Sequence, residues 1–320
     1  MGRLIFRYNN NKTGYYLINY LRQLIPGFFY RSLLRRKLQL IRKYDRKYVE
    51  DRVNYYNRLT GEHMLSDNAV TAGDFRLDPK YKTYSFDTRE YLRYFNPELK
   101  VRLVFGDITT VPGEPALLKS RPIEGDNANS VILKLNKVRH YIYIEDKKAY
   151  TEKKDMLVFR GTTKQEHRVR FMRMYKDHPM CNVGTFMADN EDNSLYAGWL
   201  PKKVQLDYKF ILCLEGFDVS SNLKWVMSSN SIAVMPEPKY ETWFMEGRLI
   251  PDYHYIQIRD DYSDLEERLK YFLIHPDEAL QIIKNANEYM SQFRDKKRED
   301  LISLMVLEKY FVVTGQSKSL

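Results

Sequence analysis

Cysteine is scarce in this sequence of 320 residues, which contains only Cys181 and Cys213. This scarcity excludes a small secreted scaffold held together by disulfides. Cys213 falls within an apolar run, so we expect no structural disulfide. The charged N-terminal residues do not resemble an apolar signal peptide, which favours a reducing, cytoplasmic location over secretion.

Other absences narrow the function. No stretch reaches the ~18 uninterrupted apolar residues of a spanning helix. The lack of a P-loop and of Gly-x-Gly-x-x-Gly argues against a kinase or a dehydrogenase. The six histidines form no pair at metal-binding spacing, and two lone cysteines make no zinc site. Asp-x-Asp, through which many sugar transferases hold a divalent metal, is also absent. We therefore expect neither a metal nor a cofactor.

Acidic residues are rare at one end of the chain. Residues 1–60 contain 14 Lys and Arg against three acidic residues, whereas the remainder contains 38 basic and 39 acidic residues, a net charge of −1. Binding to a nucleic-acid backbone should draw on a broad basic surface. The charge distribution therefore argues against nucleic acid as a partner.

Residues 1–50 are predicted to form a basic amphipathic segment. Within it, two sets of residues fall on different sides of a helix, the apolar Leu34, Leu38, Ile41 and Tyr48 and the basic Arg31, Arg35, Arg42 and Arg46. Attraction to anionic lipid headgroups would hold such a segment at a membrane face. A packed helix with a solvated basic face is an equally good interpretation.

Residues 207–293 have the pattern of a nucleotide-binding α/β domain. Short apolar runs predict strands over residues 208–214, 231–236 and 253–258. Cap-forming residues at 218–222 precede a helix beginning at residue 223, and the capping box at 263–266 predicts a helix that continues through residue 272. The alternation of strands and helices favours a parallel sheet.

The first half of the chain is less regular. Strands are predicted over residues 101–105, 129–135 and 156–159, and residues 54–97 predict no definite topology. Polar interruptions between residues 180 and 206 suggest a boundary. We therefore expect an α/β domain over residues 51–190, a nucleotide-binding α/β domain over residues 191–293 and a C-terminal helix within residues 294–320.

Three basic residues are candidates for binding the diphosphate of a nucleotide-activated substrate. Without a metal, cationic side chains and helix N-termini must stabilise this leaving group. Arg160 follows an apolar strand and should lie at its carboxyl end, where open α/β sheets bind ligands. Lys224 lies at the start of the predicted helix. For Arg160 a structural ion pair is the alternative, and Arg168 would also suit a solvated helix face.

Polar residues around the predicted strand end complete the donor site. Ser221 and Asn222 are expected to cap the helix, and such caps can also contact phosphate. Glu215 and Gly216 follow the buried strand, where a carboxylate needs either a basic neighbour or hydroxyl donors such as ribose. Glu241 is a second candidate for binding ribose or sugar.

Asp107 is the candidate catalytic base. It follows Val-Phe-Gly at the end of a predicted strand and precedes a loop. A positioned carboxylate accepts the proton of an attacking hydroxyl and typically contributes ~10²–10⁴-fold to such a step. The alternative is an aspartate that only caps its own turn.

Several spaced blocks between residues 100 and 293 resemble the bacterial branch of glycosyltransferase family 90. This branch includes lipopolysaccharide-core sugar transferases and is related to eukaryotic protein O-glucosyltransferases. The matching blocks are residues 104–107, 119–122, 158–161 with Arg168, 214–225, 238–247, 252–255 and 260–265.

The resemblance implies an α/β, GT-B-like fold with two Rossmann-like domains facing a cleft. It implies an inverting hexosyltransferase in which residues 207–260 bind the donor, the first half binds the acceptor and Asp107 matches the catalytic aspartate. The implied donor is a UDP-hexose such as UDP-glucose. The implied acceptor is a lipopolysaccharide core or another surface glycan, lipid-linked or free, assembled at the inner face of the cytoplasmic membrane.

Two alternatives remain at this point. One is a nonenzymatic protein that binds nucleic acid or another polyanion through the basic, aromatic N-terminus. The other is a sugar-phosphate transferase that uses the same cleft.

Overall fold

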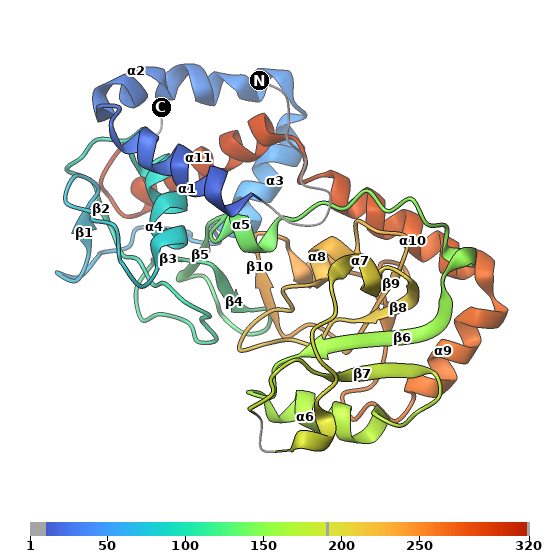
Figure 1. The fold of residues 1–320 in the computed structure, drawn as a ribbon. Coiled ribbons are helices and arrows are strands. Elements are labelled where there is room, and N and C mark those ends of the chain that lie inside the picture. Colours follow the sequence, from blue (N-terminus) through green and yellow to red (C-terminus); the bar gives the residue numbers. More distant parts are fainter. Residues whose placement is uncertain (1–10, 190–191, 319–320) are drawn as a thin grey trace. The chain divides into compact units, whose positions relative to one another are not determined.

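The computed structural model describes residues 11–189 and 192–318, which form two compact units (Figure 1). Within these residues, the first unit comprises 140–238 and 247–292. The second comprises 11–139, 239–246 and 293–318. The domain boundary expected at residues 190 and 191 falls inside the first unit, because strands of one sheet lie on both sides of it.

The first unit is built on a parallel five-stranded sheet with the order β11-β9-β8-β6-β7. When these five strands are numbered 1 to 5 in chain order, from β6 to β11, their order across the sheet is 2-1-3-4-5. This is a doubly wound arrangement whose winding direction reverses between β6 and β8. The apolar runs at 208–214 and 231–236 are confirmed as strands β8 and β9. The strands are β6 (Lys154–Gly161), β7 (Cys181–Thr185), β8 (Tyr208–Leu212), β9 (Ile232–Met235) and β11 (Ile256–Gln257).

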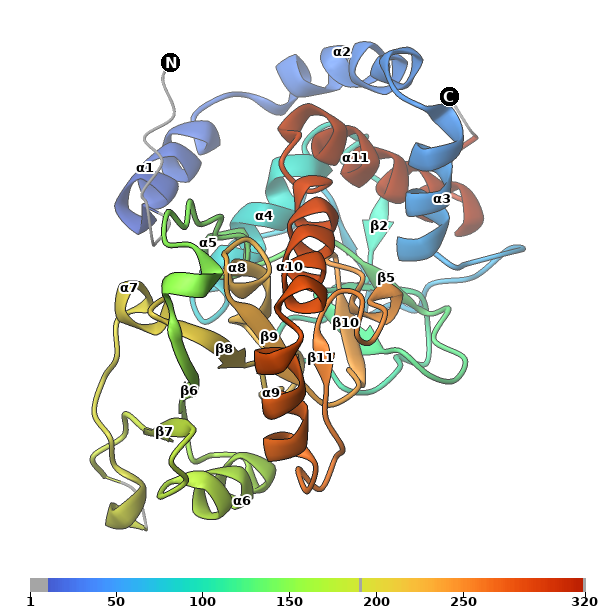
Figure 2. The ribbon, with the colours of Figure 1, turned by 90° about the vertical axis from the view of Figure 1, so that its right-hand side faces the viewer.

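Helices cover this sheet because its strands carry apolar side chains on both faces. Leu157 and Phe159 of β6 belong to a core with residues of α6, α9 and α10, whereas Val158 between them is also buried and points to the other face. Figure 2 shows α9 and α10 following one another along the sheet. The helices of this unit are α6 (Glu166–Tyr175), α7 (Lys202–Gln205), α8 (Leu223–Val226), α9 (Leu265–Ile274) and α10 (Pro276–Ser291).

Two details of the first unit differ from expectation. The run at 156–159, expected in a separate first layer, is part of β6 and pairs with β8, because an apolar pattern predicts a strand but not its partners. The capping box expected at 263–266 is wrong, because Asp264 precedes α9 without a side-chain cap. Ser263 instead donates its hydroxyl to Asp261 at 2.8 Å.

Strands of the second unit pair only two by two among the described residues. The strand predicted at 129–135 is confirmed in shortened form as β5, whereas of the run at 101–105 only Val101 belongs to a strand, β2, and Leu103 forms an isolated bridge with Leu117. The GT-B architecture therefore remains a prediction for this unit. The pairs are β1 (Val70–Thr71) with β2 (Lys100–Val101), β3 (Ala116–Leu118) with β5 (Ser130–Ile132), and β4 (Ser120–Pro122) with β10 (Tyr240–Thr242).

Most of the regular structure of the second unit is helical. The basic amphipathic segment predicted over residues 1–50 contains several helices, and Asp45 accepts from the Tyr48 amide at the start of α3. Residues 1–10 of that prediction lie outside the described residues. The helices of this unit are α1 (Lys12–Gln23), α2 (Gly27–Leu38), η1 (Gln39–Lys43), α3 (Arg46–Tyr56), α4 (Lys82–Leu92) and α11 (Lys296–Val313). The short helix α5 (Lys137–His140) lies where the chain passes from the second unit to the first. Across the described ranges, every helix is too short or too polar to cross a bilayer.

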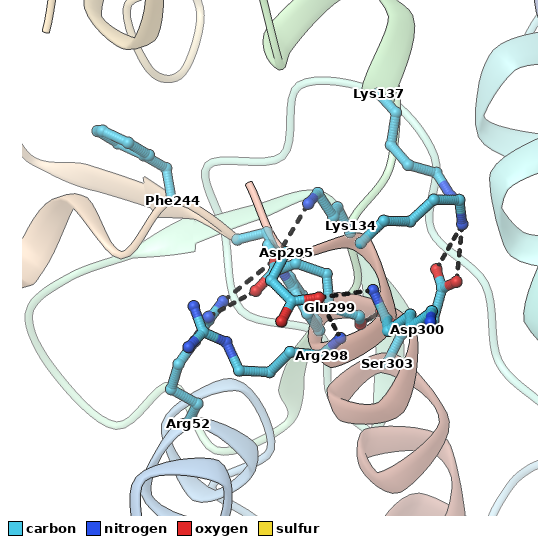
Figure 3. A network of polar contacts seen from close by, with 12 residues as sticks. Arg52, Lys134, Lys137, Phe244, Asp295, Arg298, Glu299, Asp300 and Ser303 are labelled. Carbon is cyan, nitrogen blue, oxygen red and sulfur yellow. Dashed lines mark hydrogen bonds and ion pairs between the residues drawn. The ribbon is translucent and has the colours of Figure 1, made fainter. Parts of the chain in front are cut away.

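A buried charge network joins three distant segments of the second unit (Figure 3). Glu299 of α11 accepts from Arg52 of α3 at 2.6 Å, from Lys134 at 3.0 Å and from the Trp243 indole at 2.6 Å. Burial opposes ionisation of Glu299, but the cations of Lys134 and Arg52 outweigh it and lower its pKa to about 2. The C-terminal helix predicted within 294–320 is confirmed as α11, and these contacts fix it in this unit.

Candidate active site

The carboxyl ends of β6 and β8 form the switch point of the first unit, where doubly wound sheets bind ligands. Arg168, near the start of α6, lies across both ends. Its Nε and one terminal nitrogen donate to the carbonyls of Glu215 and Leu214, each at 2.8 Å. Its other terminal nitrogen contacts the Thr162 hydroxyl at 3.4 Å. Arg168 is therefore a half-buried residue of this edge and not a member of a solvated helix face.

The turn after β8 brings Glu215 and Gly216 beside Arg168. His167 contacts the Glu215 carbonyl at 3.0 Å, and the Gly216 amide donates to the Asp218 carbonyl at 2.9 Å, which closes a tight turn. These two hydrogen bonds fix the Glu215 carbonyl and the Gly216 amide in the turn. The structure therefore brings together Arg168, Glu215 and Gly216, three of the residues predicted from the sequence.

The predicted capping role of the next residues is wrong. Asn222 occupies the N-cap position of α8 but makes no side-chain bond to the helix. Its amide instead donates to the Leu212 carbonyl at 2.9 Å, and the Ser220 hydroxyl bonds to its side-chain oxygen. Asn222 therefore ties the turn back to the end of β8, while Ser221 remains half-buried beside it.

Lys224 is fully buried in α8. Burial raises the pKa of the Cys213 thiol, and the nearby Lys224 cation opposes this rise. The ammonium is thus close enough to Cys213, which follows β8, to influence its thiol. Its predicted role in diphosphate binding stays a prediction.

Arg160 lies at the carboxyl end of β6, as predicted, on the opposite face from Phe159. Its guanidinium donates to the carbonyls of Phe159 and Asn182 at 2.9 Å, to the Asn182 side chain at 2.8 Å and to the Gly198 carbonyl at 3.2 Å. These partners are all neutral, and in the described part of the chain no carboxylate pairs with it. The alternative of a structural ion pair is therefore not observed, and burial lowers the pKa of Arg160.

Glu241 belongs to the second unit, whereas the turn after β8 belongs to the first. Its fully buried carboxylate accepts from Arg121 at 2.8 Å and from Arg58 at 3.4 Å, and it also bonds to the Tyr55 hydroxyl. These contacts describe a structural ion pair between β4 and β10. Its predicted role in binding ribose or sugar is not tested by them.

Asp107 lies on an exposed loop of the second unit, directly after Gly106. Gly106 has φ +121, a backbone conformation that favours glycine, so the turn that presents Asp107 depends on this residue. Asp107 Oδ1 pairs with the buried Lys119 ammonium, while Oδ2 bonds to no other described residue. The carboxylate is thus anchored on one side and open on the other.

A groove borders the loop that carries Asp107. It has a volume of about 650 Å³ and is lined by Ile108, which follows Asp107, and by Arg102 and Glu114, which pair at 3.3 Å. The floor and rim include the exposed Met64. A substrate with hydroxyl groups would find both polar and apolar contacts here.

Some contacts of the site were not predicted from the sequence. Lys119 was recognised only within a matching block, and its pairing with Asp107 joins residues twelve positions apart on different segments. His167 and Thr162 carry no motif of their own. Among the described residues, no cluster of three or more His, Cys, Asp or Glu side chains has the arrangement of a metal site.

Comparisons with known proteins identify the class of enzyme to which this chain belongs. The family model for glycosyl transferase family 90 matches residues 128–310. O-glucosyltransferase LpsA of Dichelobacter nodosus is 44% identical over 263 residues, 82% of each chain. Protein O-glucosyltransferase 3 of Rattus norvegicus and of Homo sapiens are each 24% identical over 168 residues, 51% of this chain and 33% of theirs.

The chain therefore belongs to glycosyltransferase family 90 and is a glycosyltransferase. The resemblance found in the sequence is confirmed. The alternative of a nonenzymatic polyanion-binding protein is not supported by this membership.

Proposed function

We propose that this protein transfers a hexose, with inversion at the anomeric carbon and without a metal ion, from a UDP-sugar to a lipopolysaccharide-core or other surface-glycan acceptor. One observation carries the donor site in this proposal: Arg168 joins the ends of β6 and β8 at the switch point of the sheet. We propose that the first unit binds the donor and that the second, in a GT-B-type enzyme, supplies the acceptor site and the base.

The diphosphate would meet cationic and polar groups at this edge. Arg160 is charged and without a carboxylate partner in the described chain, so an anion would compensate its charge. Its hydrogen bonds to the described residues use four of its five N–H groups, which leaves one for a phosphate oxygen. Arg168, Ser221, Asn222 and Lys224 complete the proposed set.

The nucleoside would lie beside the turn after β8. The Glu215 side chain follows a buried strand, and ribose hydroxyls would donate to it. Gly216 allows the ligand to approach the backbone closely because it has no side chain. We leave Glu241 out of the donor set because Arg121, Arg58 and Tyr55 already bond to its carboxylate.

Asp107 would act as the general base. The acceptor hydroxyl attacks the anomeric carbon, its proton passes to Asp107 Oδ2, and the bond between the anomeric carbon and the diphosphate oxygen breaks. Arginine and lysine side chains would stabilise the charge that develops on the departing UDP. The absence of Asp-x-Asp from the sequence supports stabilisation by these side chains instead of by a metal.

The names of relatives support the hexose and the acceptor class. The bacterial relative is an O-glucosyltransferase, which favours glucose as the transferred sugar. A lipopolysaccharide or other lipid-linked acceptor would place the reaction in the cytoplasm, at the inner face of the cytoplasmic membrane. A sugar-phosphate transferase is not favoured by any contact of the site.

Thermal unfolding in the presence of UDP, GDP, CMP and UDP-sugars tests the donor site. A ligand that binds only the folded state stabilises it by about 2.7 kcal/mol at a hundredfold excess over its dissociation constant. We expect a shift with UDP compounds that EDTA does not change and that Arg160→Ala loses.

Lys164→Ala is the matched control, because Lys164 is an exposed cation that follows β6 and makes no ion pair with the described residues. Each variant is first compared without ligand, since Arg160 also bonds to neighbouring carbonyls. A shift with GDP or CMP alone would replace the proposed donor, and no shift with any nucleotide would contradict the donor site.

A further inference from the structure

Apolar side chains are unusually exposed on α1, α2 and the turn between them. In the described chain, nine of the 22 large apolar side chains that are exposed fall within residues 17–33. They include Leu17, Leu21, Leu24, Ile25, Phe28 and Phe29. Single exposed apolar residues are normal on protein surfaces, but a concentration of this kind marks an interaction site. We call the exposed side chains of residues 17–33 the N-terminal apolar surface.

The opposite faces of the same helices are firmly packed. The Tyr15 hydroxyl of α1 donates to Asp87 at 2.7 Å, and Arg22 pairs with Glu90 at 3.0 Å. In α2, Leu34 is buried and Arg93 lies 4.5 Å from the Tyr30 ring. These contacts hold both helices against α4 and the residues that follow it. The exposed apolar side chains therefore belong to helices that are packed in the fold.

Exposed cations occur in the same part of the chain as this surface. Residues 11–44 contain eight Lys and Arg and no acidic residue. Arg31, Arg35 and Arg36 of α2 are exposed, as are Arg42 and Lys43 of the next turn. None of these five side chains forms an ion pair with any residue that the structure describes. Their charge is therefore available to an anionic partner.

We propose that the N-terminal apolar surface inserts into the headgroup region of an anionic lipid bilayer. Apolar and aromatic side chains would enter the boundary between headgroups and acyl chains, and the arginines would contact lipid phosphates. A protein partner would explain the apolar side chains, and nucleic acid would explain the charge. A bilayer with anionic lipids explains both together.

This inference rests on the proposed location of the enzyme but not on its donor. A bound bilayer would hold the second unit, which contains Asp107 and its groove, where lipid-linked acceptors are present. The surface would then raise the local concentration of acceptor without contacting the reacting atoms.

Vesicle cosedimentation of the full chain tests the proposal. Vesicles of phosphatidylcholine alone are compared with vesicles that also contain phosphatidylglycerol, at low and at high salt. We expect binding to the anionic vesicles that weakens with salt. Leu24→Ser with Phe28→Ser should abolish this binding, because Leu24 and Phe28 are 77% and 56% exposed and their loss removes apolar contacts without opening the core.

Charge reversal tests the electrostatic part. Arg35→Glu with Arg36→Glu should weaken binding by at least about 25-fold, since each of the two lost cations contributes about fivefold near the surface. Lys284→Glu with Lys297→Glu is the matched control, because it changes the net charge equally at exposed positions elsewhere. Ile274→Ser is the control for the apolar pair, since Ile274 is 75% exposed on α9.

Three results would overturn the proposal: equal vesicle binding by all variants, self-association that Leu24→Ser with Phe28→Ser abolishes while vesicles are not bound, or retention on nucleic acid but not on vesicles. UDP thermal shifts on the same proteins separate this proposal from the donor site. Vesicle binding without a UDP shift would support the membrane-binding surface and contradict the proposed donor site. A UDP shift without vesicle binding would contradict only the membrane-binding surface.

Discussion

At the scale of single residues, Asp107 is the proposed catalytic base. Lys119 anchors one of its carboxylate oxygens, and the adjacent Ile108 lines the groove. This arrangement suits a base, because the carboxylate is oriented but still able to accept a proton.

Asp107→Asn should lower the transfer rate by about 10²–10⁴-fold, because an amide cannot accept the acceptor's proton. The UDP thermal shift should persist, since the donor set lies in the other unit. The measurement is kcat with a sugar acceptor alongside that shift. Asp67→Asn, an exposed aspartate in the same unit, is expected to leave both unchanged. Unchanged turnover in Asp107→Asn would exclude this residue as the base.

Glu299 is the residue whose charge matters most for stability. Glu299→Gln should destabilise the protein at neutral pH by about 3–5 kcal/mol, because it leaves Arg52 and Lys134 buried without their shared carboxylate. Urea unfolding measures this loss. The exposed Glu288→Gln should have little effect.

The stability difference between wild type and Glu299→Gln should depend on pH. The pKa of Glu299 is lowered from 4.5 to about 2 in the folded state, so its ionisation stabilises the fold above pH 4.5. This contribution, roughly 3 kcal/mol, should disappear as the pH falls from 4.5 to 2. The difference in unfolding free energy between wild type and Glu299→Gln should shrink across that window. A constant difference would contradict the lowered pKa.

At the scale of elements, the carboxyl end of β7 depends on close packing. Gly184 pairs with Arg160 of β6, and a Cβ there would lie 2.5 Å from the Ala197 Cβ and 2.7 Å from the Leu195 carbonyl. The strand end can therefore approach the 195–197 segment only with glycine at this position.

Gly184→Ala should cost about 1–3 kcal/mol of stability, because backbone or Ala197 must move to relieve the overlap. Urea unfolding followed by circular dichroism measures the cost. Gly113→Ala is the matched control, since a Cβ at Gly113 would have no neighbour within 4 Å. Equal stability of the two variants would show that the 195–197 segment can shift away from the added methyl group at little cost in free energy.

Local patterns in the sequence predicted a strand or helix correctly where the residues of that element alone determine its conformation. Continuous apolar runs predicted β8 and β9, and residues 294–320 were expected to contain the helix that became α11. The pattern failed where competing partners decide the outcome. Asn222 bonds to the Leu212 carbonyl in preference to the helix, and Ser263 bonds to Asp261 in preference to a capping box.

At the scale of the whole molecule, the chain returns to the second unit after building the first. Residues 293–318 add α11, whose buried Leu301, Leu307 and Tyr310 belong to the core of that unit. Neither unit is therefore a simple half of the sequence.

Deleting residues 293–320 should unfold the second unit and spare the first. Amides of β3 and β5 should then exchange rapidly with solvent, because α11 and Glu299 are gone, while β6 and β8 stay protected. Hydrogen exchange measured segment by segment tests this, with the full chain as reference. Protection of β3 and β5 in the shortened chain would show that α11 is not needed for the second unit.

The sequence by itself determined the family, the parallel α/β character of residues 207–293 and the location of the excess positive charge. These follow from local residue patterns, which need no knowledge of partners. Only the tertiary structure decided that β6 joins β8, that Arg168 spans both strand ends, that Lys119 holds Asp107 and that the apolar side of α1 and α2 faces solvent. Each of these depends on segments far apart in the chain, and their pairing is fixed by packing and charge and not by local periodicity.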